Sequence, residues 1–176
     1  MEICRQNESL EIRELDPFLA ELLRQIPDSV ETKNSPAAEE RLFSAPAGAE
    51  EKELRSEWKL YIVPELRRLF QSATETVRQD LEQLHCTKKP FANCTLKIPL
   101  AHADAWLNAL NQARLAIAAS YNFTEYELSD HFRSPLGSRR DLSLFQVNFY
   151  GFLQEFILRE MECGEVTPPN DERPSA

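Results

Sequence analysis

The sequence predicts a mainly α domain with a small β part (α+β), in which a helical bundle of about four to five helices carries a small antiparallel N-terminal hairpin. Two observations support this class. Apolar residues recur every three or four positions over most of the chain, as in amphipathic helices, and alternate with polar residues only near residues 2–14 and 93–98. The 11 prolines lie mostly where this spacing changes, which marks the element boundaries.

The N-terminal segment predicts a hairpin followed by a helix. Side chains alternate in residues 2–5 and 10–14, with a polar stretch between them. Asp16 and Pro17 then match a helix N-cap and first helical position, and apolar residues repeat at helical spacing as far as Pro27. The polar segment that follows, to residue 49, is expected to be a loop with a short turn near residues 39–43.

The central segment predicts one long helix over residues 54–84, interrupted by Pro64. The proline implies either a kink near Leu60 or two abutting helices. After this helix, the alternation in residues 94–98 would add a third strand beside the hairpin, which gives the sheet the stability that an isolated hairpin lacks.

The C-terminal half predicts two helices that pack closely. Residues 100–119 contain eight alanines, which allow a neighbouring helix to approach. A capping-box spacing at Thr124 and Glu127 predicts a short helical turn, and residues 134–138 are expected to be a loop.

The second of these helices begins near residue 142. Residues 142–154 carry no charge, so we expect it to be buried on several sides, with Gly151 admitting a close helix crossing. Cys163 and Gly164 are expected to stop it. Residues 1–163 are then one domain, and residues 164–176 a disordered tail.

Charge and composition exclude several classes of protein. The 176 residues carry a net charge of −9, and residues 1–57 contain 14 acidic and 7 basic side chains. This balance disfavours direct nucleic-acid binding, although the acidic first third could meet a basic protein surface. No apolar run is long enough for a membrane span and the N-terminus lacks signal-peptide features, so we expect a cytoplasmic protein without membrane contact.

Motifs for catalysis or cofactor binding are missing from the sequence. The four glycines are too far apart for a phosphate-binding loop, and no nucleophile motif is present, so we expect no enzyme and no cofactor. His85, Cys86, Cys94 and His102 could form a zinc set, but their spacing matches no zinc signature, so no metal site is expected. A Cys86–Cys94 redox pair is an alternative, although reduced thiols are expected in the cytoplasm.

Polar residues beside the apolar helix faces are the candidate site. Asn111 and Arg114 flank the apolar face of the alanine-rich helix, whereas Gln154 and Glu155 interrupt the uncharged helix near Tyr150. Because a buried charge needs a partner, we expect Arg114 to pair with Glu155 between the two helices. The cluster either sets the register of the helices or forms a ligand-binding polar site.

Three segments resemble a known family. Residues 104–117 contain the short motifs Trp-Leu, Ala-Leu-Asn and Arg-Leu in this order. With this spacing they resemble a helix of the bacterial family of unknown function number two thousand and seventeen. Residues 144–157 resemble its C-terminal helix with a Leu-Gln-Glu motif, and residues 22–28 resemble its Leu-Leu…Pro-Asp turn. The resemblance spans residues 2 to about 161, and Asn111, Arg114, Gln154 and Glu155 match the family motifs.

The resemblance implies a hairpin on a helical body and no established enzyme activity. The family is related to actinobacterial oxidative-stress regulators: some members are described as redox-responsive proteins that assist transcription through a protein partner, and members are often encoded near a Clp protease adaptor. The redox-responsive members carry closely spaced N-terminal thiols, whereas Cys4 stands alone here.

Together these observations lead to two functional hypotheses. The first is a non-enzymatic regulatory or adaptor module that binds another protein, from the transcription or Clp proteolysis machinery, with a homodimer through residues 142–158 also considered. The alternative is a small anionic ligand-binding protein, or an enzyme, that uses Arg114 and Glu155.

Overall fold

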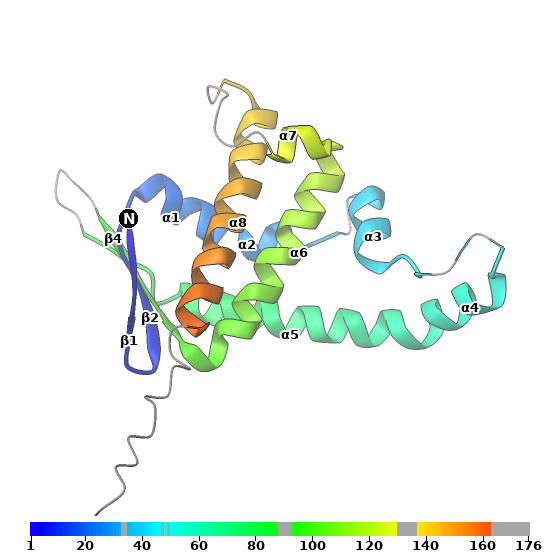
Figure 1. Cartoon of the computed structure of the whole chain (residues 1–176), viewed down its shortest axis with the longest axis horizontal. Helices are drawn as coiled ribbons and strands as arrows, with labels where there is room; N and C mark the ends of the chain where they lie inside the picture. Colours follow the sequence, from blue (N-terminus) through cyan, green and yellow to red (C-terminus); the bar gives the residue numbers. More distant parts are fainter. Residues whose placement is uncertain (33–34, 47, 49, 88–92, 130–136, 163–176) are drawn as a thin grey trace, which may run out of the picture.

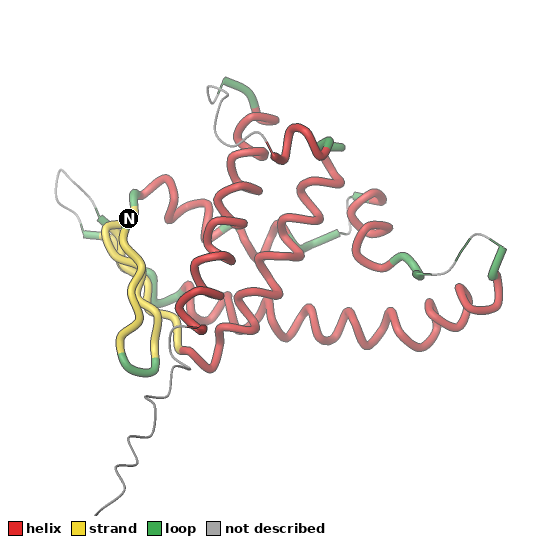
Figure 2. The backbone as a smooth tube through the Cα atoms, viewed as in Figure 1, coloured by secondary structure: helices red, strands yellow, loops and turns green. Residues whose placement is uncertain are grey.

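The structure of the protein is a computed structural model that describes residues 1–32, 35–46, 48, 50–87, 93–129 and 137–162. Figures 1 and 2 show a helical body with a small sheet at one side and one long helix that projects from the other. The predicted mainly α class with α+β character is confirmed. The expected tail, the helix stop at residues 163–164 and most of the loop at 134–138 lie outside the described residues. In the part of the chain that is described, no helix is both long and apolar enough to cross a membrane.

The sheet contains the predicted hairpin and third strand, together with a strand that the pattern did not predict. Its order is β1-β2-β4-β3 and all neighbours are antiparallel. Leu10 pairs with Ile98 and Ile12 with Leu96, and these four side chains are buried on the inner face. The unpredicted strand β3 has two residues, too few for an alternating pattern. The strands are β1 (Glu2–Gln6), β2 (Ser9–Leu15), β3 (His85–Cys86) and β4 (Cys94–Pro99).

Helix starts follow the expected capping chemistry. The Asp16 carboxylate accepts from the backbone N–H of Phe18, and Thr124 and Glu127 form the reciprocal capping box. The short turn expected near residues 39–43 is a complete helix. The helices of the body are α1 (Pro17–Arg24), α2 (Ile26–Ser29), α3 (Pro36–Phe43), the 3₁₀ turn η2 (Leu100–His102), α6 (Ala103–Tyr121), α7 (Glu125–Ser129) and α8 (Arg139–Glu162).

The predicted long helix is continuous through Pro64. It consists of α4 (Lys52–Glu57), a π-helical turn η1 (Trp58–Ile62) and α5 (Val63–Leu81). Pro64 has no N–H to donate, and the wider π-helical turn before it, which contains Leu60, accommodates that loss, so the chain does not break into two abutting helices. We call residues 52–72 the arm, because this part of the long helix extends beyond the body in Figure 1.

The core is centred on α6, which packs against α3, α5 and α8. Trp106 of α6 and Tyr150 of α8 are the largest fully buried side chains. The expectation that α8 is buried on several sides holds for Val147, Phe149 and Leu153, but it is wrong for its outer face, where Phe152 is 45% exposed. Described neighbours cover α8 from the inner side only.

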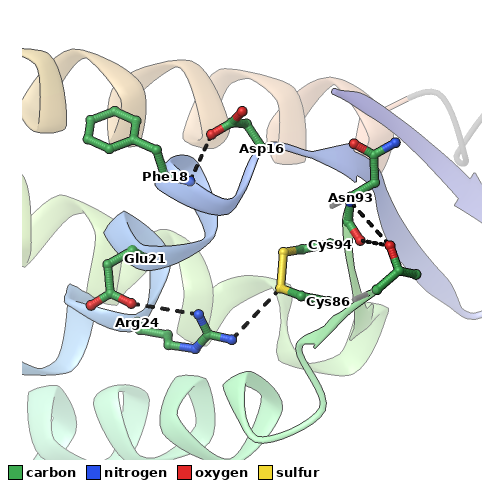
Figure 3. The surroundings of a disulfide bond; sticks show 8 residues. Asp16, Phe18, Glu21, Arg24, Cys86, Asn93 and Cys94 are labelled. Atoms are coloured by element: carbon green, nitrogen blue, oxygen red, sulfur yellow. Dashed lines mark hydrogen bonds and ion pairs between the residues drawn. A yellow bond between two sulfur atoms is a disulfide. The ribbon is translucent and has the colours of Figure 1, made fainter. Parts of the chain in front are cut away.

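Cys86 and Cys94 are joined in a disulfide between β3 and β4, so the expectation of reduced thiols is wrong in this structure. Cys94 is buried in the sheet, whereas Cys86 is exposed. Figure 3 shows Arg24 of α1 beside the bond, with its Nη2 atom 4.0 Å from the Cys86 sulfur and its Nη1 atom 3.7 Å from Glu21. The bond ties the two-residue edge strand to the sheet.

Removing the disulfide should destabilise the protein. The two cysteines are eight positions apart in the sequence, and a cross-link of this span restricts the unfolded chain, so Cys86→Ala with Cys94→Ala should lower the free energy of unfolding by about 2–3 kcal/mol. Urea unfolding under oxidising conditions measures this loss. Dithiothreitol should destabilise the wild type similarly, while Cys4→Ala should not. Equal midpoints for the oxidised wild type and the double variant would contradict the prediction.

Candidate functional site

The structure does not bring the predicted polar cluster together in one site. Arg114 and Gln154 meet where α6 and α8 cross: Nη1 of Arg114 donates to Oε1 of Gln154 at 2.6 Å, and Nε2 of Gln154 donates to the backbone oxygen of Leu107 at 3.0 Å. Asn111 is exposed on the same helix as Arg114. Tyr150 is fully buried and faces α1 instead.

The expected ion pair between Arg114 and Glu155 is wrong. Glu155 is exposed and pairs with Arg159 one turn further along α8, at 3.2 Å. Adjacent residues of a helix point about 100° apart, so only Gln154 can face Arg114 while Glu155 faces the solvent. The helix contact is therefore made by an amide, and Arg114 has no carboxylate partner among the described residues.

The guanidinium of Arg114 is half-buried, and this burial lowers the pKa of Arg114. Its Nε–H is enclosed and has no hydrogen-bond partner in the described part of the chain. The group lies against Gly151: a Cβ atom built on this glycine would be 3.1 Å from Cζ of Arg114 and 3.2 Å from Nε and Nη2. The close crossing expected at Gly151 is thus occupied by the arginine side chain.

Tyr150 belongs to a separate buried network that joins α8 to α1 and α2. Its hydroxyl donates to the backbone oxygen of Leu22 at 2.6 Å and accepts from Nε2 of Gln146 at 2.7 Å. Burial raises the pKa of Tyr150 to about 12. With no path to solvent, Tyr150 supports the packing of the helices rather than a binding surface.

A second polar cluster, which the sequence did not indicate, joins α5 to the start of α6. Asp80 is only 3% exposed, and its carboxylate accepts from Nε1 of Trp106 at 2.8 Å and contacts Nδ1 of His102 at 3.0 Å. One signal was present, because Asp80 lies between Val77 and Leu84 at helical spacing, on the apolar stripe itself.

The zinc alternative is not supported by the positions of its four residues. Cys86 and Cys94 are bonded to each other, while His102 bonds to Asp80. In the described ranges, no three His, Cys, Asp or Glu side chains are grouped to hold a metal ion.

The arm carries five of the ten large apolar side chains that are exposed among the described residues. Its inner side is covered by α3: Nε1 of Trp58 donates to the backbone oxygen of Phe43 at 3.1 Å, and Arg67 lies 4.2 Å above the Phe43 ring and pairs with Glu39. Five large apolar side chains elsewhere on the arm are 40–65% exposed. We call them the open face: Leu54, Leu60, Tyr61, Ile62 and Leu69.

A comparison with known protein families identifies the family of this chain. The model of DUF2017, a domain of unknown function, matches residues 5–161. The chain belongs to this family. No curated protein and no solved structure matches it. Membership agrees with the resemblance seen in the sequence, and the description of the family assigns no function.

The Tyr150 network should make stability depend on pH in alkaline solution. A raised pKa means that the folded state holds the phenolic proton more tightly than the unfolded chain, whose pKa is about 10. Stability is therefore complete below about pH 10 and falls as the pH rises towards 12. At pH 11 the wild type should lose about 1.4 kcal/mol that Tyr150→Phe does not lose.

Urea unfolding of wild type and Tyr150→Phe at pH 9 and pH 11 measures this difference. The variant removes a hydrogen bond and is less stable at pH 9, but its further loss at pH 11 should be smaller. Parallel losses in the two proteins would show that Tyr150 does not carry the pH dependence.

The buried carboxylate of Asp80 should be a major source of stability. Asp80→Ala leaves the buried Trp106 N–H without an acceptor, so the free energy of unfolding should fall by about 2–4 kcal/mol. Denaturant unfolding followed by tryptophan fluorescence tests this. The matched control is Asp104→Ala, an exposed aspartate at the start of α6, which should cost less than about 0.5 kcal/mol. Similar losses in both variants would refute a special role for Asp80.

Proposed function

We propose that the protein is a non-enzymatic adaptor or regulatory module that binds another protein through the open face of the arm. The observation that carries this proposal is the exposure of Leu54, Leu60, Tyr61, Ile62 and Leu69 within 16 residues of one helix. Groups of exposed apolar side chains on one segment mark interaction sites in folded proteins, because exposing them to water is unfavourable.

The arm is held against α3 by contacts within the chain. The contacts of Trp58 and Arg67 with α3 hold its inner side, and the rings of Phe43 and Phe70 lie 5.7 Å apart at the same junction. A surface that is rigid before binding loses little conformational freedom on association. From Leu54 to Leu69 the open face spans about 22 Å of helix. This length suits the binding of the arm, as an amphipathic helix, in a groove of the partner.

The charge around the arm favours a different protein over a second copy of this chain. Residues 36–57, which form α3 and lead through α4, contain six glutamates and three basic residues. The whole chain carries −9, so two copies repel each other. We therefore infer a partner that offers an apolar groove with a basic rim. Proteins of transcription or of Clp proteolysis are the first to test, because the family resemblance points to them.

The two groups that the enzyme alternative requires do not lie together. It required Arg114 and Glu155 in one site, but Glu155 pairs with Arg159 on the outer surface. Arg114 alone can still bind a ligand, a role that is separate from the open face.

Site-specific photo-crosslinking tests the proposed function. A benzoylphenylalanine in place of Leu60 should capture one recurring partner protein in cells, whereas the same group in place of Glu82, an exposed residue at the end of α5, should not. Adding Leu69→Asp should abolish the adduct. Because Leu69 is 54% exposed, this change should alter stability by less than about 0.5 kcal/mol.

The captured protein is then identified by mass spectrometry, purified and titrated with the full chain. Leu60→Glu should weaken binding at least about tenfold, and raising the salt concentration should weaken it further, because the rim contacts are electrostatic. Adducts that form equally from position 82, or that survive Leu69→Asp, would contradict the proposal. An adduct of two copies of this chain would replace the partner protein by a homodimer.

A further inference from the structure

We propose that Arg114 anchors a binding site for a carboxylate at the crossing of α6 and α8. The site consists of Arg114 and Asn111 on α6 and of Gln154 and Gly151 on α8. It shares no residue with the arm, so the two proposals succeed or fail independently.

The first argument is that the guanidinium has unused donors. Of its five N–H groups, one is used by Gln154, and the remaining Nη1 and Nη2 donors have no protein acceptor among the described residues. Half-buried cations usually face a carboxylate that compensates for the lost hydration. Here the neighbouring acid, Glu155, faces the solvent and pairs with Arg159, so a bound anion would supply the missing partner.

The second argument is that the guanidinium is held in one orientation. The amide of Gln154 is fixed from both ends, by Leu107 and by Arg114 itself, which determines the position of its oxygen. The absence of a side chain at Gly151 lets the flat group rest on α8, since a Cβ there would approach Cζ to 3.1 Å. A donor that is already oriented loses little freedom when it binds a ligand.

Asn111 supplies a second donor beside the arginine. Residues 107, 111 and 114 follow the i, i+4, i+7 spacing, so they lie on one stripe of α6. Gln154 spans both ends of this stripe, which places Asn111 next to the same contact. Its exposed side-chain amide makes no hydrogen bond in the described structure and can donate to an anion held by Arg114.

The number of charges selects the class of ligand. One guanidinium and one neutral amide balance a single negative charge, and the planar fork of arginine matches the two oxygens of a carboxylate. A phosphate dianion would need a second cation, which this group of residues does not contain. The carboxylate belongs either to a small free acid or to the C-terminus of a peptide, and these share the same chemistry at Arg114.

The Nε–H resonance of Arg114 in ¹H–¹⁵N spectra is a direct readout. Because Nε is enclosed, its proton exchanges slowly with water and should be visible at neutral pH. Propionate and N-acetyl-alanylalanine should each shift this resonance saturably, with Kd on the order of millimolar, as expected for one charge-assisted contact. The C-terminal amide of the same dipeptide should cause no shift. Tighter binding of the dipeptide than of propionate assigns the site to peptide C-termini, and equal binding assigns it to free acids.

Three variants separate binding from folding. Arg114→Gln should weaken binding at least about tenfold, measured on neighbouring backbone amides, and Arg114→Lys should weaken it because the fork is lost. Gly151→Ala moves the guanidinium by a few tenths of an ångström while improving helix propensity, so binding should weaken without a fall in the urea midpoint. The control, Arg68→Gln, removes one exposed positive charge from the arm and should leave binding unchanged.

Several results would overturn the proposal. These are no saturable shift with either carboxylate, shifts that persist in Arg114→Gln, or inorganic phosphate binding as tightly as propionate. If Arg114→Gln does not fold, the other two variants still test the proposal. A site at Arg114 requires that Gly151→Ala weakens binding and that Arg68→Gln leaves it unchanged.

Discussion

The buried carboxylate of Asp80 is the contact on which the arrangement of this protein depends. It accepts from the indole of Trp106 and contacts the imidazole of His102, and so joins the end of α5 to the beginning of α6. A carboxylate that is withdrawn from water is stable only with such donors, which makes the joint specific in position and direction. Because α5 continues backwards into the arm, the same joint determines where the arm points relative to the body.

The two halves of the long helix have opposite surroundings. The C-terminal half buries Ala73, Val77 and Leu81 against the body, whereas the N-terminal half contacts α3 on one side and exposes large apolar side chains to water. The buried C-terminal half therefore holds the N-terminal half in its exposed position. A surface that costs free energy to expose, carried on a rigid support, is the physical basis for proposing that the protein binds a partner.

Small residues have a related effect where α6 and α8 cross. Alanines on α6 and the glycine at position 151 bring the two helices close enough for the guanidinium of Arg114 to lie between them. The amide of Gln154 then satisfies one donor of Arg114 without neutralising its charge. The positive charge of Arg114 therefore remains at the crossing, partly removed from water, where it can attract an anion.

The sequence by itself determined the local structure. The hairpin, the strand at 94–98, the helix starts at Asp16 and Thr124 and the long helix all follow from periodicity, prolines and capping residues, because these signals act within a few neighbouring positions. It also placed Asn111, Arg114 and Gln154 near the contact between two helices. The tertiary structure decided which side chains meet. Arg114 bonds to Gln154 and not to Glu155 because adjacent residues of a helix face different directions. The Cys86–Cys94 bond, the burial of Asp80 and the exposure of the arm likewise depend on how distant segments pack, and the order of residues along the chain does not contain that information.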